Sequence, residues 1–243
     1  MEEKINLIHS QKQNIKTIIS RLQKEFPGAK CALEHETPHQ LLVSTILSAQ
    51  CTDARVNMVT PSLFKKYKTV KDFTTANQNE LEKEIYSTGF YKNKAKAIIA
   101  SSKVLLEIFK GKIPQTVEEL TSLPGVGRKT ANVVLGTVFN IATGIVVDTH
   151  VSRLSQRLGL TKQKNAEKIE QDLMKIVPQK HWILFSHWLI LHGRKTCDAR
   201  KPKCSVCVLN DVCPSASKFL YMVEESRIQA VTSKTNVREF LTT

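Results

Sequence analysis

Residues 123–129 read Leu-Pro-Gly-Val-Gly-Arg-Lys, and this stretch carries the turn signals of a helical hairpin. Just before it, Thr116 is followed three residues later by Glu119, a spacing that predicts a capping box opening a helix over residues 117–123. The Pro-Gly pair ends that helix, the second glycine permits a tight turn, and another helix begins near the Arg-Lys pair. The sequence therefore predicts a helical hairpin over about residues 117–136.

The hairpin is a candidate site for phosphate. Gly125 and Gly127 allow backbone N–H groups to converge at the start of the second helix, where amides and the helix dipole attract an anion whatever the base sequence. Leu123 belongs to the same turn and Arg128 adds a positive charge. A glycine-containing turn with no ligand is the alternative. We assign these four residues to DNA contact because the whole chain is strongly basic.

Lys129 falls in the first turn of the second helix. The helix dipole disfavours a positive charge there and so favours the neutral amine, which a nitrogen nucleophile must be. An ordinary phosphate-binding lysine explains the residue equally well. Both interpretations stay open at this point.

Asp148 directly precedes another helical pattern that begins at Thr149. An aspartate at a helix N-cap needs no further explanation. Its functional alternative is a carboxylate that faces Lys129, moves protons and stabilises a cation at a sugar carbon.

Apolar residues recur at helical spacing along almost the whole chain. Gly and Pro are few, 9 and 8 of 243 residues, which suits helices joined by short turns. The only strand-like run covers three residues, 145–147. We therefore predict an all-α fold.

The charge of the chain indicates a polyanionic partner. Its 36 Lys and Arg residues exceed its 22 Asp and Glu residues, which makes the formal net charge +14. Such an excess is typical of nucleic-acid-binding proteins, although some soluble proteins are merely basic. No stretch reaches the roughly 18 apolar residues of a membrane helix, and the N-terminus has no apolar signal segment. We expect a soluble, cytoplasmic protein.

Four cysteines lie within 17 residues as Cys197, Cys204, Cys207 and Cys213, with the spacing C-x6-C-x2-C-x5-C. Structural zinc sites usually contain two C-x2-C pairs, whereas this pattern has one pair with a single cysteine on each side. The spacing therefore favours a [4Fe-4S] cluster over zinc, and unliganded thiols are the third alternative. Cys31 and Cys51 lie far away in sequence, and we interpret them as small buried residues.

A basic patch surrounds the first of these cysteines. Because phosphate contacts position a protein on DNA without reading sequence, we predict that its members contact the DNA backbone. A solvated run of charges is the alternative. The members of the patch are Arg194, Lys195, Arg200, Lys201 and Lys203.

Five segments together resemble one known family. They are LPGVGRKTANVVL, VDTHVSRLSQRLGL, the four-cysteine signature, LLVSTILSAQCTDARVN and STGFYKNKAKAI, and they span roughly residues 10 to 215. Together they resemble the endonuclease III family, bifunctional DNA glycosylase/lyases of the helix-hairpin-helix superfamily.

The resemblance implies a two-domain, all-α helix-hairpin-helix DNA glycosylase fold. A six-helix barrel domain is implied for residues 31–142. The iron–sulfur cluster domain is implied for residues 1–30 with 143–216, and the cleft would lie between the two domains. Residues 217–243 form a C-terminal extension to which we assign no role.

The resemblance also implies the roles of single residues. Lys129 matches the family's nucleophile and Asp148 its catalytic carboxylate, and the four cysteines match the ligands of one [4Fe-4S] cluster. Gln50 matches the glutamine that fills the gap left by an extruded base. Phe90 stands where the family often has a leucine wedge that enters the opposite strand.

The implied activity is base excision repair. The expected partner is double-stranded DNA with a damaged pyrimidine or an abasic site, and we expect the chain to act as a monomer. A glycosylase step would remove the base, and a lysine Schiff base would then cleave the strand 3′ to the abasic site by β-elimination.

Three other functions remain as alternatives. An adenine mismatch glycosylase generally lacks the lysine, carries a catalytic Glu in the early helix and adds a large C-terminal domain. Here Lys129 is present and residues 42–50 contain no Glu. A non-enzymatic helix-hairpin-helix protein would not require Lys129 together with Asp148. A redox iron–sulfur protein that uses DNA only as a scaffold would not require them either.

Overall fold

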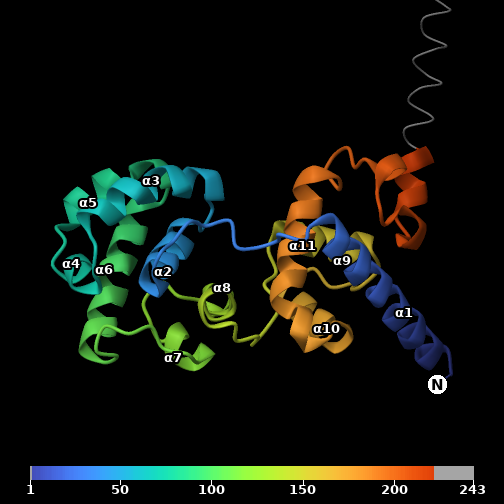
Figure 1. Cartoon of the computed structure of the whole chain (residues 1–243), viewed down its shortest axis with the longest axis horizontal. Coiled ribbons are helices and arrows are strands. Elements are labelled where there is room, and N and C mark those ends of the chain that lie inside the picture. The colour runs from blue at the N-terminus through green and yellow to red at the C-terminus, as the bar shows by residue number, and fades with distance from the viewer. Residues whose placement is uncertain (1, 222–243) are drawn as a thin grey trace, which may run out of the picture. The chain divides into compact units, whose positions relative to one another are not determined.

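A computed structural model of the chain describes the backbone of residues 2–221 and the side chains of residues 14–221. Every regular element in this part of the chain is a helix (Figure 1), which confirms the predicted all-α class. The strand-like run at residues 145–147 was a wrong indication, because it lies in an irregular connection. Three apolar residues without a pairing strand cannot form a sheet.

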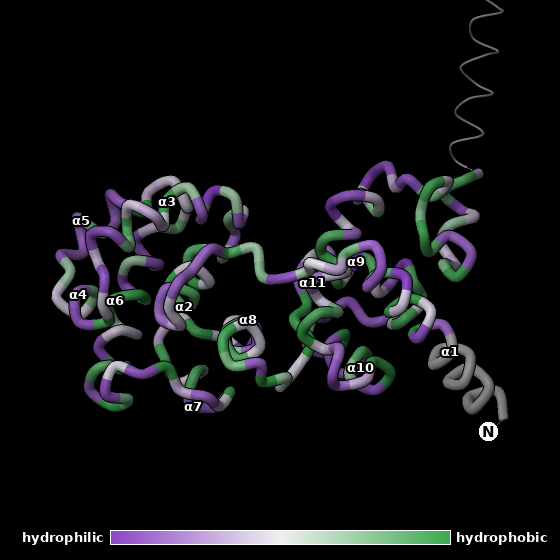
Figure 2. The backbone as a smooth tube through the Cα atoms, viewed as in Figure 1, coloured by the Kyte–Doolittle hydropathy of each residue, from purple (hydrophilic) through white to green (hydrophobic). Residues whose placement is uncertain are grey.

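The chain divides into two compact units, residues 30–146 and residues 2–29 with 147–221. Along their helices, hydrophobic and hydrophilic residues alternate in short runs (Figure 2), as amphipathic helices require. None of the described helices is long and apolar enough to cross a membrane.

Residues 30–146 form a helical unit around one core. Its elements are α2 (Pro38–Leu47), α3 (Asp53–Lys66), α4 (Val70–Thr74), α5 (Gln78–Glu84), the 3-10 turn η1 (Tyr86–Thr88), α6 (Tyr91–Glu107), α7 (Val117–Thr121) and α8 (Arg128–Phe139). Each α-helix contributes buried apolar side chains, among them Leu41, Val56, Phe73, Leu81, Ile98, Leu120 and Leu135.

Two helices of this unit begin differently from the others. The helices α2, α3, α4, α5 and α7 begin at a Thr or Asn whose side chain accepts a hydrogen bond from a first-turn N–H. In α6 and α8 the N-cap positions are Phe90 and Gly127, and neither makes a side-chain cap hydrogen bond. Both are residues for which the sequence predicts DNA contact.

The second unit combines α1 (Glu2–Glu25) with the chain from residue 147 onward. Its further elements are α9 (Thr149–Arg157), α10 (Ala166–Ile176), η2 (Gln179–His181), α11 (Trp182–Lys195), η3 (Cys204–Val206), η4 (Asn210–Val212) and a helical segment at residues 216–221. Helix α11 packs against α1 and α9. The core between them holds fully buried side chains, among them Ile18, Leu22, Leu154, Phe185 and Trp188. Of the predicted C-terminal extension, residues 222–243 lie outside the described residues.

Candidate DNA-binding, catalytic and iron–sulfur sites

The α7–α8 hairpin is attached to the core by its apolar residues. Leu123 and Val126 are only 2% and 6% exposed, whereas Gly125 between them is exposed. Gly125 has φ +79°, and a Cβ built there would stand 2.6 Å from the Cβ of Ala97 on α6. Glycine is therefore required at this position by backbone angle and by space. Because the Leu123 side chain is buried, only its backbone is available for the predicted DNA contact.

The α7 helix begins at Val117 as predicted, but it ends early and lacks the reciprocal half of the capping box. It ends at Thr121 rather than at residue 123, because Leu123 leaves the helix to enter the core. At its start, Thr116 Oγ1 accepts from the N–H of Glu119 at 3.2 Å, as predicted. The same hydroxyl donates to the Glu119 carboxylate at 2.9 Å, so the carboxylate contacts the side chain of the N-cap residue rather than its backbone.

The N-terminus of α8 receives no side-chain cap from its N-cap residue. Helix α8 begins at Arg128, as predicted, and its N-cap Gly127 has no side chain to satisfy the first-turn N–H groups. A Cβ added to Gly127 would meet nothing within 4 Å, so the space beside this N-cap residue is open. Arg128 and Lys129 follow at once and are exposed. This arrangement is suited to bind a phosphate.

Lys129 and Asp148 lie in different units. Lys129 is the second residue of α8, with its side chain exposed to solvent. Asp148 is half-buried and is the N-cap of α9, where its Oδ1 accepts from the N–H of Val151 at 2.8 Å. The carboxylate thus performs the capping role, which uses one of its two oxygens.

Gln50 and Phe90 share an unusual backbone conformation. Among the described residues, four non-glycine residues have a positive φ, and these two are among them at +53° and +50°. Both are exposed, Phe90 to 62%. Left-handed non-glycine residues are strained and concentrate at functional sites, where the surrounding structure holds them in place.

Two tyrosines that the sequence analysis did not single out lie beside Phe90. Tyr86 is 65% exposed, and its ring lies 4.8 Å from that of Tyr91, measured between centroids. Tyr91 is half-buried against the core, whereas Tyr86 and Phe90 are exposed and precede the start of α6 in the sequence. Exposed aromatic rings are one feature of surfaces that stack on nucleic-acid bases.

The four cysteines line one pocket. Its walls come from α9, α11 and the segment 196–219, with apolar contributions from Leu154, Leu158 and Phe219. Zinc requires every sulfur within about 2.3 Å of one point, whereas the corners of an iron–sulfur cube stand further apart. The described residues contain no group of three or more His, Cys, Asp or Glu side chains placed to hold a single metal ion.

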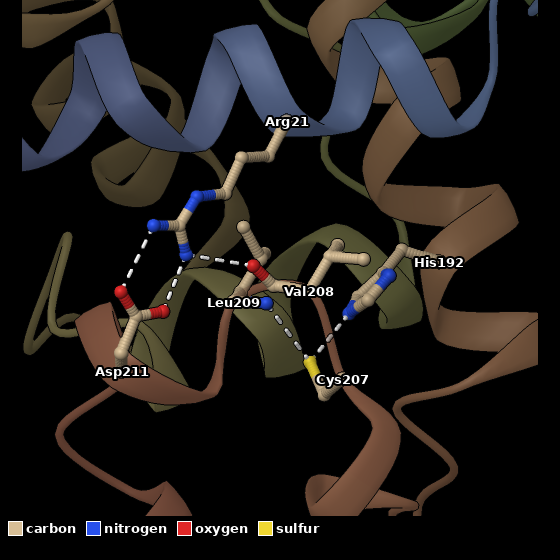
Figure 3. A network of polar contacts seen from close by, with 6 residues as sticks. All are labelled: Arg21, His192, Cys207, Val208, Leu209 and Asp211. Carbon is tan, nitrogen blue, oxygen red and sulfur yellow. Dashed lines mark hydrogen bonds and ion pairs between the residues drawn. The ribbon is translucent and has the colours of Figure 1, made fainter.

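Polar groups contact three of the four cysteine sulfurs, and one of these contacts joins Cys213 Sγ to the carbonyl of Arg157 at 3.4 Å. Arg157 on α9 donates from Nη1 to Cys197 Sγ at 3.2 Å and also to the carbonyl of Asp198 at 2.7 Å. The sulfur of Cys207 accepts from the N–H of Leu209 at 3.4 Å and lies 3.4 Å from Nε2 of the buried His192 (Figure 3). Such contacts orient ligands and stabilise charge on sulfur. The sequence analysis did not identify Arg157 or His192.

Helix α1 holds the cysteine-containing segment through one arginine. Arg21 donates to both carboxylate oxygens of Asp211 and to the carbonyl of Val208 at 2.8 Å (Figure 3). A bidentate arginine fixes both distance and orientation. The N-terminal helix is thereby attached to the segment that lines the pocket.

Burial raises the pKa of the thiols of Cys204, Cys207 and Cys213, in the case of Cys207 to about 11. Neighbouring cysteines raise the pKa of each of these thiols further, because thiolates repel one another. Such thiols become thiolates when a metal replaces their protons. The donor set thus fits a positively charged metal centre.

The predicted basic patch is exposed at all five positions. Two of its members also support the fold. Lys195 Nζ forms an ion pair with the Glu25 carboxylate at 3.3 Å and lies 5.5 Å from the centroid of the Phe26 ring. Lys203 Nζ donates to the Lys195 carbonyl at 2.9 Å.

Elsewhere, Cys31 and Cys51 are half-buried against the core of residues 30–146.

Two family models match the chain in these same regions. The HhH-GPD superfamily of base excision DNA repair proteins matches residues 43–179, and the iron–sulfur binding domain of endonuclease III matches residues 197–213. Endonuclease III of Synechocystis is 52% identical over 216 residues, which cover 89% of this chain and 99% of the relative. The chain belongs to the endonuclease III family. The Escherichia coli K12 endonuclease III is 41% identical over 201 residues, covering 83% of this chain and 95% of the relative.

Solved structures of endonuclease III agree with this membership. A non-covalent endonuclease III–DNA complex and a trapped endonuclease III–DNA covalent intermediate each superpose with a TM-score of 0.82 at 43% identity. Each alignment covers 86% of this chain and 98% of the other. The matched iron–sulfur domain begins and ends at the outer cysteines of the signature, so the cofactor of this family member is one [4Fe-4S] cluster.

Proposed function

We propose that this member of the endonuclease III family removes damaged pyrimidines from double-stranded DNA and cleaves the strand 3′ to the abasic site. The observation that carries the proposal is Lys129, an exposed amine in the first turn of α8, the second helix of the hairpin. A lysine amine is a nucleophile that forms a Schiff base with a sugar aldehyde.

DNA binding begins at the phosphates. The first-turn amides of α8 and the exposed Arg128 bind one stretch of backbone, and the basic patch at residues 194–203 binds another. These contacts read no sequence, which suits an enzyme that must search all DNA for damage.

The damaged base then leaves the helical stack. A damaged base is easier to unstack than an intact one, and this difference supplies part of the selectivity. Gln50 enters the gap that the base leaves, and Phe90 enters the opposite strand as a wedge. Both residues are exposed and held in a fixed backbone conformation, as this role requires.

Chemistry follows at the sugar. Lys129 Nζ attacks C1′ and forms a C–N bond while the glycosidic bond breaks, and the base leaves with the bonding electrons. Asp148 stabilises the developing positive charge and moves protons between the lysine and the sugar. Ring opening produces a Schiff base that acidifies the C2′ proton. Loss of that proton expels the 3′ phosphate by β-elimination.

The cluster takes no part in these steps. Cys197, Cys204, Cys207 and Cys213 are the proposed ligands, and a [4Fe-4S] cluster bound to them cross-links the segment that carries the basic patch. We further propose that residues 31–142 form the six-helix barrel domain and residues 1–30 with 143–216 the cluster domain. The enzyme would act as a cytoplasmic monomer.

Borohydride trapping on a duplex that contains thymine glycol tests the proposal. Wild type should form a covalent protein–DNA band, because borohydride reduces the Schiff base to a stable amine. Lys129→Ala should form none and should still bind the duplex, because the hairpin amides remain. Lys103→Ala removes an exposed lysine of α6 and should trap like wild type. A wild type that binds DNA tightly but forms no band would contradict the lyase function.

A further inference from the structure

Lys94 is a buried lysine that has no role in the proposed DNA binding or chemistry. It lies in the first turn of α6 and is only 5% exposed. Lysine is almost never fully buried unless its ammonium group is paired. Here Nζ donates to the carbonyl of Leu47 at 2.8 Å and to the carbonyl of Thr88 at 2.8 Å.

The two carbonyls occupy equivalent places in different elements. Leu47 is the last residue of α2, and Thr88 is the last residue of η1. Final carbonyls of a helix have no partner within it, and a cation placed there satisfies them and complements the helix dipole. One ammonium group therefore joins two helix ends that are 41 residues apart in the sequence, since 88 − 47 = 41.

A strained turn follows each of these carbonyls. Gln50 comes three residues after Leu47, and Phe90 comes two residues after Thr88. Both have a positive φ, which persists in a non-glycine residue only when the surroundings impose it. Lys94 holds the chain immediately before each turn, so its two bonds fix the distance between the turns.

Burial lowers the pKa of Lys94, and the nearby Cys51 opposes this shift. Cys51 is the residue next to Gln50, which again places the ammonium group against the first turn. Hydrogen bonds from a buried ammonium group are stronger than those from a neutral donor. The two contacts are therefore suited to keep the two carbonyls in place when DNA pushes against the turns.

We propose that Lys94 is a positioning residue that holds the Gln50 turn and the Phe90 turn at the separation needed to open one base pair. The inference rests on the proposed function. Filling a gap in one strand and wedging the other are a single coordinated event, so the two side chains must keep a fixed spacing under the resistance of the duplex. Rigid support of this kind is what holds a functional group in place.

The Lys94→Met variant tests the proposal, because methionine keeps the apolar stem and removes the ammonium group. Two reactions are compared: base release from a thymine glycol duplex, and strand cleavage at an abasic site in a single-stranded oligonucleotide. The single strand has no base pair to open. We expect duplex base release to fall about tenfold or more, while single-strand cleavage changes less than about twofold.

A fluorescent base analogue placed opposite the lesion gives a direct readout of extrusion. The analogue 2-aminopurine brightens when it unstacks, and we expect this signal to be smaller in Lys94→Met than in wild type.

The matched control is Ser102→Ala. Ser102 lies on α6 near its other end, where its hydroxyl is 3.2 Å from His39 Nε2 on α2. This variant removes a polar link between the same two helices without touching either turn, and it should leave extrusion as in wild type.

A double-mutant cycle separates positioning from general stability. If Lys94 acts through the two turns, Lys94→Met should cause no further loss in a Gln50→Ala/Phe90→Ala background. If Lys94→Met does not fold, Lys94→Arg takes its place, because it keeps a buried cation but presents its donors in a different geometry. The same selective loss on duplex DNA is then expected.

Three results would overturn the inference: a Lys94 variant that matches wild type on the duplex, an equal loss on both substrates, or an additive loss in the cycle. Failure of the proposed function is distinguishable from these results. In that case wild type itself would release no base and form no trapped band.

Discussion

Asp148 caps α9 with one carboxylate oxygen, which accepts from the N–H of Val151. The same residue is the proposed catalytic carboxylate. Capping and catalysis depend on different properties of the side chain, because the cap requires only an acceptor oxygen whereas proton transfer and charge stabilisation require a carboxylate. The two roles can therefore be separated by substitution.

Asp148→Asn should keep the cap and lose the chemistry. Asparagine is as good an N-cap as aspartate, so we expect the free energy of unfolding to change by less than about 0.5 kcal/mol and the cluster to stay intact. Base release in single-turnover assays should fall about a hundredfold or more. Asp148→Ala is the control, since it should also lose about 1 kcal/mol of stability. Full activity in Asp148→Asn would show that the residue is only a cap.

His39 makes the stability of residues 30–146 depend on pH. It is 8% exposed and packs on the Phe73 ring, and burial lowers its pKa from 6.5 to about 4. Between these values the unfolded chain binds a proton at this ring and the folded chain does not. The neutral ring therefore contributes up to about 3 kcal/mol above pH 6.5, and this contribution is lost as the pH falls toward 4.

Urea unfolding at pH 7 and at pH 4.5 measures this contribution. Wild type should lose about 2–3 kcal/mol more than His39→Gln over that interval, because glutamine does not titrate. Parallel losses in the two proteins would mean that other groups cause the pH dependence.

At the scale of elements, the α7–α8 hairpin contains two glycines with different requirements. Gly125 has a positive φ and no room for a Cβ, whereas Gly127 has φ −95° and open space around it. The first is needed to fold the hairpin. The second leaves the first turn of α8 accessible to a phosphate.

Alanine substitutions should separate these two requirements. Gly125→Ala should destabilise the fold by about 2 kcal/mol or more, because it adds backbone strain to a contact with Ala97. Gly127→Ala should change stability by less than about 1 kcal/mol and should weaken binding to undamaged duplex DNA. Thermal melting and fluorescence anisotropy measure the two effects. Equal melting temperatures for the two variants would contradict this assignment.

At the scale of the whole molecule, the two units depend differently on the cofactor. The cysteine pocket lies within residues 147–221, and Arg21 links the segment around it to α1. Residues 30–146 have a core of their own that contains no part of this pocket. Loss of the cluster should therefore affect one unit far more than the other.

Oxidative removal of the cluster, followed by hydrogen exchange, tests this expectation. Amides of residues 147–221 should lose protection, and amides of residues 30–146 should retain it. Affinity for DNA should fall, because the basic patch belongs to the affected unit.

Metal analysis of anaerobically purified protein should find iron and sulfide, and stoichiometric zinc would contradict the cofactor assignment.

Local signals in the sequence were sufficient for several elements. The start of α8 after the second hairpin glycine, the N-cap at Asp148 and the cap at Thr116 are each determined by residues within one helical turn. The cysteine spacing indicated the cofactor for the same reason, because the ligands are neighbours in the chain. The catalytic roles of Lys129 and Asp148 stay predictions.

What the tertiary structure alone decided involves partners far apart in the sequence. Arg21 meets Asp211 across 190 residues, Lys94 meets Leu47 across 47, and Arg157 meets Cys197 across 40. Long-range packing also explains the misleading strand signal at residues 145–147 and the early end of α7. A strand forms only beside a partner strand, and the Leu123 side chain leaves the helix because it is buried in the core. By itself the sequence determined the helices, their caps and the chemistry of the ligands, which depend on neighbouring residues. Which buried groups support the reactive ones depends on packing, and packing exists only in the folded chain.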